Sequence, residues 1–176
     1  MYGMEQTPEW HHKDIFAHTM QVVDNAAKLS SKMEIRFAAL VHDIAKPNTR
    51  RVDKNRGYTF HGHDAVGERM LNKVSRRMKL SNRLKGYIKK LTKLHLRPIA
   101  LAKNIVTDSA IRRLMVESGE DIDDLMTLCR ADITTKNSNR VKQYLKNFDL
   151  VEEKIKNVIK IDAKKLFQSP VRGDEI

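Results

Sequence analysis

The sequence predicts an all-α fold, a bundle of about six to eight helices. Apolar residues recur three or four positions apart through successive segments, the spacing of amphipathic helices. Only seven Gly and four Pro interrupt the 176 residues, and 40% of the chain is hydrophobic while 32% is charged. This balance is typical of a soluble globular protein, and the length suits a single domain.

The first helices follow from apolar stripes and from their stop signals. Ile15, Val22, Ala26 and Leu29 share one stripe, and the next stripe must end before Pro47, because proline disfavours helix in the residue before it. The polar residues 47–60, which include a Gly, are expected to form a loop. The four helices of this half are expected at about 14–29, 33–44, 63–78 and 81–96.

A short irregular stretch is expected after Arg97 and Pro98. Thr107 or Asp108 can cap the helix that follows, since both side chains accept hydrogen bonds from backbone N–H groups. The helices of this half are expected at about 107–118, 121–133 and 139–159. We assign residues 1–160 to one domain and 161–176 to a tail or a truncated linker.

Composition excludes several classes of protein. No apolar run approaches the roughly 20 residues of a membrane span, and the first ten residues lack the pattern of a secretory signal. We therefore expect a cytoplasmic protein with no membrane partner. Cys129 is the single cysteine, so it can form neither an internal disulfide nor a Cys-x-x-Cys zinc site. Any metal must be held by His and carboxylate side chains.

The formal net charge of +12 and a pI near 9.9 favour an anionic partner, such as RNA, a nucleotide or an acidic lipid surface. Much of the basic charge lies between Lys73 and Lys93 and between Lys136 and Lys165. A solvated helix face and a nucleic-acid-binding footprint are equally compatible with this pattern. The aromatic residues are not interleaved with the basic ones, so no base-stacking platform is indicated.

Ionisable residues recur on the apolar stripes of five of these helices. His18 shares the stripe of Ile15 and Val22, and Asp43 lies beside His42 at a helix end. Burying one unpaired ionisable group costs several kcal/mol, which a shared cation would offset. A single such His is more often a hydrogen-bonded core residue than a ligand, but six groups together favour a metal site. The predicted ligands are His18, His42, Asp43, His63, His95 and Asp132.

The order His18, His42-Asp43 in LVHDIAKP, and Asp132 in RADI resembles that of the HD superfamily of metal phosphohydrolases. The segments FHGHDAVGERM, HLRPIAL and DLMTLCRADIT extend the resemblance to the HD domain of bacterial CCA-adding tRNA nucleotidyltransferases, especially those of the Bacteroidetes type. The resemblance implies an HD-domain helical bundle. It also implies that His63 and His95 allow two metals to bind rather than one.

Two departures from these relatives stand out. The Gly-Ser or Gly-Gly loop and the Asp-x-Asp pair of a nucleotidyltransferase head are missing, so the chain is not expected to add nucleotides. The chain is either a piece of a longer polypeptide or a free-standing relative. Ala45 stands where relatives usually have Gly, which would cost about 1 kcal/mol if the position needed a left-handed backbone.

Four imidazoles and two carboxylates suit one or two divalent transition metal ions, Fe, Mn, Ni, Co or Zn, better than Mg. With Asp43 bridging two ions, water ionised between them would attack phosphorus. In a one-metal site, His63 and His95 would instead contact phosphate or move protons. Lys46, Arg97 and Arg112 are weaker candidates for phosphate contacts. A surface lysine at a helix end explains Lys46 equally well, and an ordinary ion pair is the more common role for each arginine. His61 is either a ligand or a loop residue.

The resemblance implies phosphomonoesterase or phosphodiesterase activity on 2′-phosphate or 2′,3′-cyclic phosphate nucleotides, or on tRNA 3′ ends. Two alternatives stay open. One is a non-catalytic basic tRNA-binding domain, and the other is a free nucleotidase or cyclic-dinucleotide phosphodiesterase with no RNA partner. The sequence indicates no oligomeric state.

Overall fold

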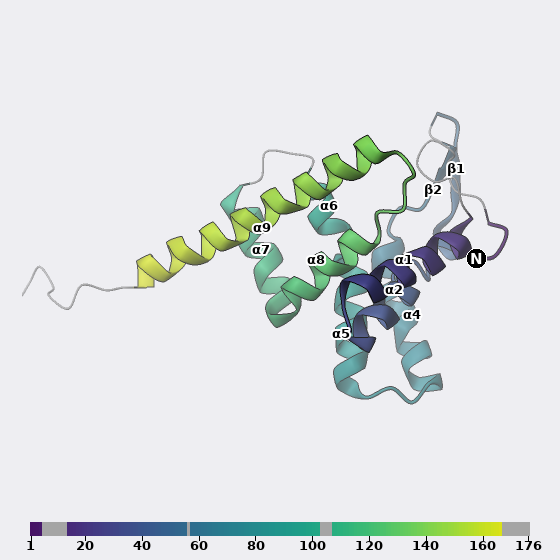
Figure 1. The fold of residues 1–176 in the computed structure, drawn as a ribbon. Helices are drawn as coiled ribbons and strands as arrows, with labels where there is room; N and C mark the ends of the chain where they lie inside the picture. Colours follow the sequence, from purple (N-terminus) through teal and green to yellow (C-terminus); the bar gives the residue numbers. More distant parts are fainter. Residues whose placement is uncertain (5–13, 56, 103–106, 167–176) are drawn as a thin grey trace, which may run out of the picture.

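The computed structural model describes residues 1–4, 14–55, 57–102 and 107–166 (Figure 1). The all-α expectation is confirmed, and each of the expected ranges contains a helix. The elements are α1 (Ile15–Leu29), α2 (Met33–Val41), α3 (Lys46–Thr49), β1 (Arg51–Asp53), β2 (Gly57–Thr59), α4 (His63–Arg77), α5 (Asn82–Leu94), α6 (Leu96–Ala102), α7 (Asp108–Ser118), a 3₁₀ turn (Gly119–Asp121), α8 (Ile122–Ala131) and α9 (Ser138–Leu166).

Three segments differ from expectation. The stretch read as a loop at 47–60 contains α3 and an antiparallel hairpin that pairs Arg51 with Thr59. Residues 98–102 of the expected irregular stretch are helical, because Pro98 lies in the first turn of α6, where no hydrogen bond to a preceding carbonyl is lost; residues 103–106 lie outside the described residues. α9 continues to Leu166, so residues 161–166 of the expected tail are helix, and residues 167–176 lie outside the described residues.

Side-chain caps define where several helices begin. Asp14 Oδ1 accepts a hydrogen bond from the Ala17 N–H at 2.6 Å, and Ser81 Oγ accepts one from the Leu84 N–H at 3.2 Å. Thr107, not Asp108, caps α7. Each such cap typically contributes about 1 kcal/mol. Among the described residues, no helix combines the length and apolarity that crossing a bilayer requires.

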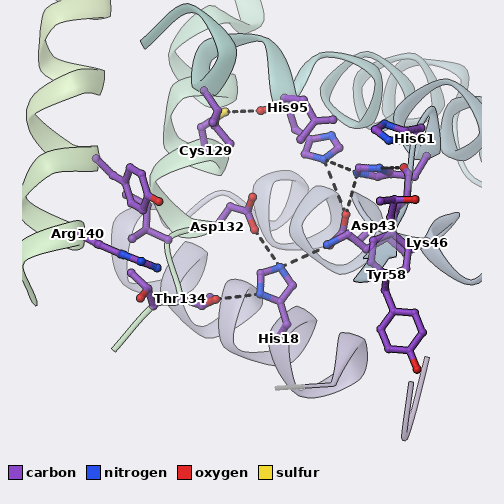
Figure 2. A pocket seen from close by; sticks show the side chains of 18 of the residues that line it. His18, Asp43, Lys46, Tyr58, His61, His95, Cys129, Asp132, Thr134 and Arg140 are labelled. Atoms are coloured by element: carbon purple, nitrogen blue, oxygen red, sulfur yellow. Dashed lines mark hydrogen bonds and ion pairs between the residues drawn. The ribbon is translucent and has the colours of Figure 1, made fainter. Parts of the chain in front are cut away.

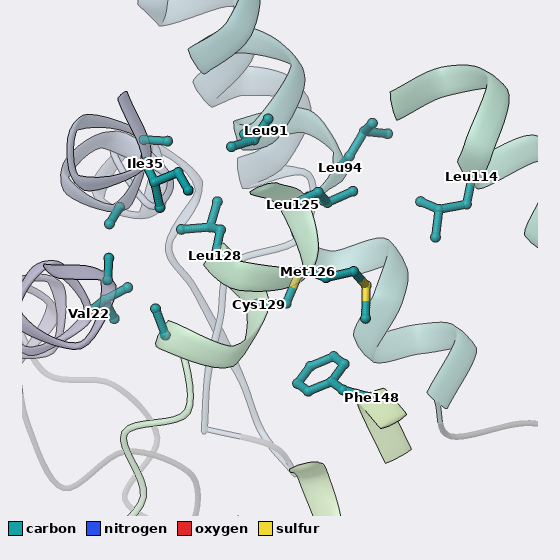
Figure 3. Packing of buried hydrophobic residues seen from close by; sticks show 14 of the residues in the cluster. Val22, Ile35, Leu91, Leu94, Leu114, Leu125, Met126, Leu128, Cys129 and Phe148 are labelled. Carbon is teal, nitrogen blue, oxygen red and sulfur yellow. The ribbon is translucent and has the colours of Figure 1, made fainter. Parts of the chain in front are cut away.

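Helix α8 lies at the centre of the core and contacts α1, α2, α5, α6, α7 and α9. Its buried Leu125 and Leu128 pack among residues such as Val22, Ile35 and Leu91 (Figure 3). The long α9 runs along α6 and α7 (Figure 1) and buries Phe148, Val151, Ile155 and Val158. This arrangement holds the C-terminal ends of α2, α5 and α8 close together.

Candidate metal centre

The six predicted ligands come from five helices, and most of them lie at helix ends. His18 lies within α1, His63 is the first residue of α4, and His95 and Asp132 directly follow α5 and α8. His42 and Asp43 form the turn after α2. Five of these side chains are almost fully buried, and that of Asp132 is 19% exposed. The close-up shows His18, Asp43, His95 and Asp132 pointing toward one another (Figure 2).

The carboxylate of Asp43 lies between two pairs of imidazoles. Its Oδ2 is 3.5 Å from His18 Nε2 and 3.2 Å from His42 Nε2. Its Oδ1 is 3.2 Å from His63 Nε2 and 3.8 Å from His95 Nε2. Each oxygen therefore faces one pair, which is the arrangement expected of a carboxylate that bridges two cations.

The ligand atoms fall into two groups, each with its atoms within 4.8 Å of one another. The first group is His18, His42 and Asp132, and the second group is Asp43, His63 and His95. In the first group, Asp132 Oδ1 is 3.0 Å from His18 Nε2 and 3.5 Å from His42 Nε2. In the second group, His63 Nε2 and His95 Nε2 are 3.3 Å apart.

Glycines allow the close approach that the second group requires. Gly62 has a φ of +74°, a left-handed conformation that admits a sharp turn into α4 immediately before His63. A Cβ added to Gly67 would lie 3.0 Å from Thr92 Cγ2, so this glycine lets α4 approach α5. The two helices thereby bring His63 and His95 together.

The Nδ1 atom of each imidazole has a partner that orients the ring. The Nδ1 atoms of His42, His63 and His95 each lie 2.7 Å from the carbonyl oxygen three residues earlier. A carbonyl only accepts, so these Nδ1 atoms donate and each Nε2 of a neutral ring presents a lone pair. His18 Nδ1 is 2.9 Å from Thr134 Oγ1.

Lone pairs on nitrogen thus face carboxylate oxygens inside the protein. His42 Nε2 and Asp132 Oδ1 are buried with no hydrogen-bond partner in the part of the chain that the structure describes. Leaving such atoms unpaired is costly, and a shared cation satisfies them together. The donor set and its orientation therefore fit metal binding by both groups.

A comparison with known protein families agrees with this geometry. The model of the HD domain matches residues 15–137. The chain belongs to the HD domain family. This family lies within a superfamily of metal-dependent phosphohydrolases. All six predicted ligands fall inside the matched segment, and α9 lies beyond it.

Charges around the HD centre shift the pKa values of its groups in opposite directions. Burial lowers the pKa of His42, but Asp43 and Asp132 outweigh burial and raise it to about 10. Burial raises the pKa of Asp43, but His42 and Lys46 outweigh burial and hold it well below the usual value. Burial lowers the pKa of His95 to about 4, and the neighbouring His42 adds to the effect.

Lys46 belongs to the centre and is not a surface lysine. Its side chain is only 9% exposed, and its Nζ lies 2.7 Å from Asp43 Oδ2 and 5.6 Å from the centre of the Phe60 ring. The lysine therefore places a positive charge beside the Asp43 carboxylate, at the wall of the cavity that opens over the ligand cluster. Its contact with substrate phosphate stays a prediction.

Two other candidates for phosphate contacts lie elsewhere. Arg97 Nη1 is 3.3 Å from Glu117 Oε1, and Arg112 Nη2 is 2.8 Å from Asp162 Oδ1. Neither arginine lines the cavity that the described residues form. The guanidinium groups pair with carboxylates of α7 and α9, and their contact with substrate phosphate stays a prediction.

Ala45, the departure from the usual Gly, fits without strain. Its φ of −93° and ψ of −2° lie in a region open to L-residues, and its side chain is fully buried. The residue therefore pays no left-handed penalty, and the loop after Asp43 keeps its helical turn into α3.

A cavity of about 480 Å³ opens over the ligand cluster. Sequence reasoning missed most of its wall, which includes Thr134 and the α9 residues Arg140 and Tyr144. Figure 2 shows Arg140 and Thr134 on the side of Asp132, with Lys46 and His61 on the side of Asp43. His61 is exposed and lines the cavity without joining either ligand group.

Proposed function

We propose that the protein is a metal-dependent phosphohydrolase that cleaves phosphate esters at the HD centre. The observation that carries this proposal is the position of Asp43, whose two oxygens face two separate pairs of imidazole nitrogens. Such a carboxylate can hold two cations side by side. Five further ionisable groups gather around it in the core, and shared cations would offset the cost of burying them.

The first group would hold one ion and the second group the other, with Asp43 shared. A donor set of imidazole nitrogen and carboxylate oxygen favours Fe, Mn, Co, Ni or Zn over Mg. When bound, such ions polarise phosphoryl oxygens and make water acidic enough to act as a nucleophile near neutral pH.

The chain's own residues supply orientation and charge. Backbone carbonyls fix three imidazoles in the tautomer that leaves Nε2 for a cation. Lys46 Nζ offers donors to a phosphoryl oxygen at the cavity wall. Cys129 does not act as a nucleophile in this proposal, because burial raises the pKa of its thiol and its Sγ donates to the His95 carbonyl at 3.1 Å.

For the substrate, we propose a nucleotide ester, namely a 2′-phosphate, a 2′,3′-cyclic phosphate or the phosphorylated 3′ end of a tRNA. The resemblance to the HD domain of CCA-adding tRNA nucleotidyltransferases supports this choice. The net charge of +12 also favours an anionic substrate or a tRNA partner.

The test is hydrolysis of bis-p-nitrophenyl phosphate and of p-nitrophenyl phosphate with Mn, Fe, Ni, Co or Zn. The wild type should hydrolyse at least one ester. Asp43→Asn should lower the rate by about a thousandfold or more, because several kcal/mol of transition-state stabilisation depend on the bound ions. Circular dichroism should show unchanged helix content.

Asp24→Asn is the matched control, since Asp24 is an exposed aspartate of α1 that does not line the cavity. It should keep the wild-type rate. A wild type that hydrolyses no ester with any of these metals would contradict the proposal. The non-catalytic tRNA-binding domain would then be the better interpretation, and its affinity for tRNA should fall steeply with salt.

A further inference from the structure

The cavity gathers aromatic residues that are scattered in the sequence. The chain contains five Phe, four Tyr and one Trp, and four of these ten aromatics line this cavity. Tyr58 and Phe60 come from the hairpin and the residue after it, and Tyr144 and Phe148 come from α9. The fold thus assembles an aromatic wall that the linear pattern does not indicate.

The α9 part of this wall is held firmly against the core. Phe148 is 3% exposed, and Val151 and Ile155 are buried further along the same helix. Arg130 of α8 pairs through Nη2 with Asp149 at 2.8 Å and with Glu152 at 3.0 Å. Tyr144, one turn before Phe148, is therefore presented at the cavity by a fixed helix rather than by a loop.

Polar groups on the same helix add directional contacts. Asn147 lines the cavity, and its Oδ1 accepts a hydrogen bond from Gln143 Nε2 at 2.8 Å. This bond orients the amide so that Nδ2 can donate to an acceptor on a ligand. Arg140 lines the wall one turn before Tyr144. The wall therefore offers aromatic faces, one amide donor and a cation.

We propose that α9 forms a nucleobase-binding subsite of the HD centre, with Tyr144 as its specificity-determining residue. Flat aromatic faces suit stacking of a base, and the Asn147 amide suits a ring nitrogen or carbonyl at the edge of the base. A cavity of about 480 Å³ is in the range that holds one small organic ligand. The phosphate of the same nucleotide would then reach the ligand cluster.

This inference rests on the proposed function for the place of the phosphate, but it assigns residues outside the HD domain match. The match ends at residue 137, and α9 begins at Ser138. The HD segment would thus supply the reactive centre, and the appended helix would select a nucleotide over a phosphate ester that lacks a base.

The test compares binding of adenosine 5′-monophosphate and ribose 5-phosphate by isothermal titration calorimetry, with the full chain in its metal-loaded form. We expect the nucleotide to bind at least about 10-fold more tightly than the sugar phosphate. Tyr144→Leu keeps apolar bulk but removes the ring, so it should weaken nucleotide binding by about 5-fold to 150-fold. Binding of ribose 5-phosphate should stay within 2-fold.

Tyr144→Phe keeps the ring and should retain wild-type nucleotide affinity. Leu145→Ala changes the neighbouring residue of α9, which is exposed and does not line the cavity, and should change neither affinity. Equal affinity of the wild type for the two ligands would overturn the subsite. So would equal weakening of both ligands by Tyr144→Leu, or binding of hexyl phosphate as tight as that of the nucleotide.

The two proposals fail in different ways. If the base-dependent difference is found but no ester is hydrolysed, the subsite stands and the proposed hydrolysis fails. If chromogenic esters are hydrolysed at the wild-type rate by Tyr144→Leu and no base effect is measured, the hydrolase stands and the subsite is overturned.

Discussion

The two ligand groups share Asp43 but differ in the negative charge around them. The first group contains Asp132 Oδ1 and also faces Asp43 Oδ2, so two carboxylates surround its imidazoles. The second group has a single carboxylate, because Asp43 Oδ1 alone faces its two histidines. Two groups with similar donors therefore offer different attraction to a cation.

The pKa values follow this difference. In the first group, the carboxylates raise the pKa of His18 against the effect of burial, and that of His42 reaches about 10. In the second group, burial and the neighbouring His42 lower the pKa of His95 to about 4. Without a metal, His42 would hold a proton at neutral pH and His95 would stay neutral. We infer that two ions bind in sequence, the tighter one at the first group.

The sharpest way to separate the two groups is to remove a ligand from one of them. His95→Gln should abolish binding of the weaker ion and leave the tighter one, so metal analysis should find the stoichiometry reduced from two to one. The reason is that the first group keeps all its own ligands. Elemental analysis after dialysis against a defined free metal concentration measures this.

His61→Gln is the matched control for that experiment. His61 lines the same cavity but belongs to neither ligand group, so its substitution should leave both ions bound. If His95→Gln removed both ions together, or if His61→Gln removed one, the division into two groups would be wrong.

A smaller effect should follow from loosening one ligand without removing it. Thr134 Oγ1 lies 2.9 Å from His18 Nδ1 and orients that ring. Thr134→Val keeps the shape but loses the hydrogen bond, and such losses typically lower metal affinity by about 10-fold to 100-fold. Competition with a chromogenic chelator would measure the change for the tighter ion.

Thr135→Val provides the comparison, because Thr135 lines the same cavity and its Oγ1 accepts from the Asn137 N–H rather than from a ligand. Its metal affinity should match that of the wild type. An equal effect of both substitutions would show that Thr134 acts through the loop and not through His18.

The ligand cluster could be predicted from sequence for a physical reason. His18 lies on an apolar stripe, where a buried ionisable group needs compensation, and the same conflict recurs at His95. The prediction named all six residues that the structure brings together, although their binding of metal stays a prediction. The long helices were predictable for the same reason, because their apolar periodicity extends over several turns.

The cavity wall could not be predicted in this way. Tyr144 and Thr134 are half-buried residues whose positions contain no conflict between burial and charge. The hairpin and α6 are too short to show a repeating pattern of apolar residues. Pro98 favours an interruption of helix, although it lies in the first turn of α6. The partners of Arg97 and Arg112 were not predictable either, because the sequence gives no sign of which carboxylate pairs with each guanidinium group.

The most direct measurement is the transition-metal content of the wild-type chain, purified without chelator and then titrated with Mn, Fe, Ni, Co or Zn. Our account predicts two ions per chain at saturation, bound in two steps, with the tighter ion retained through dialysis. Absence of any bound transition metal, before and after supplementation, would contradict the assignment of the six ligands.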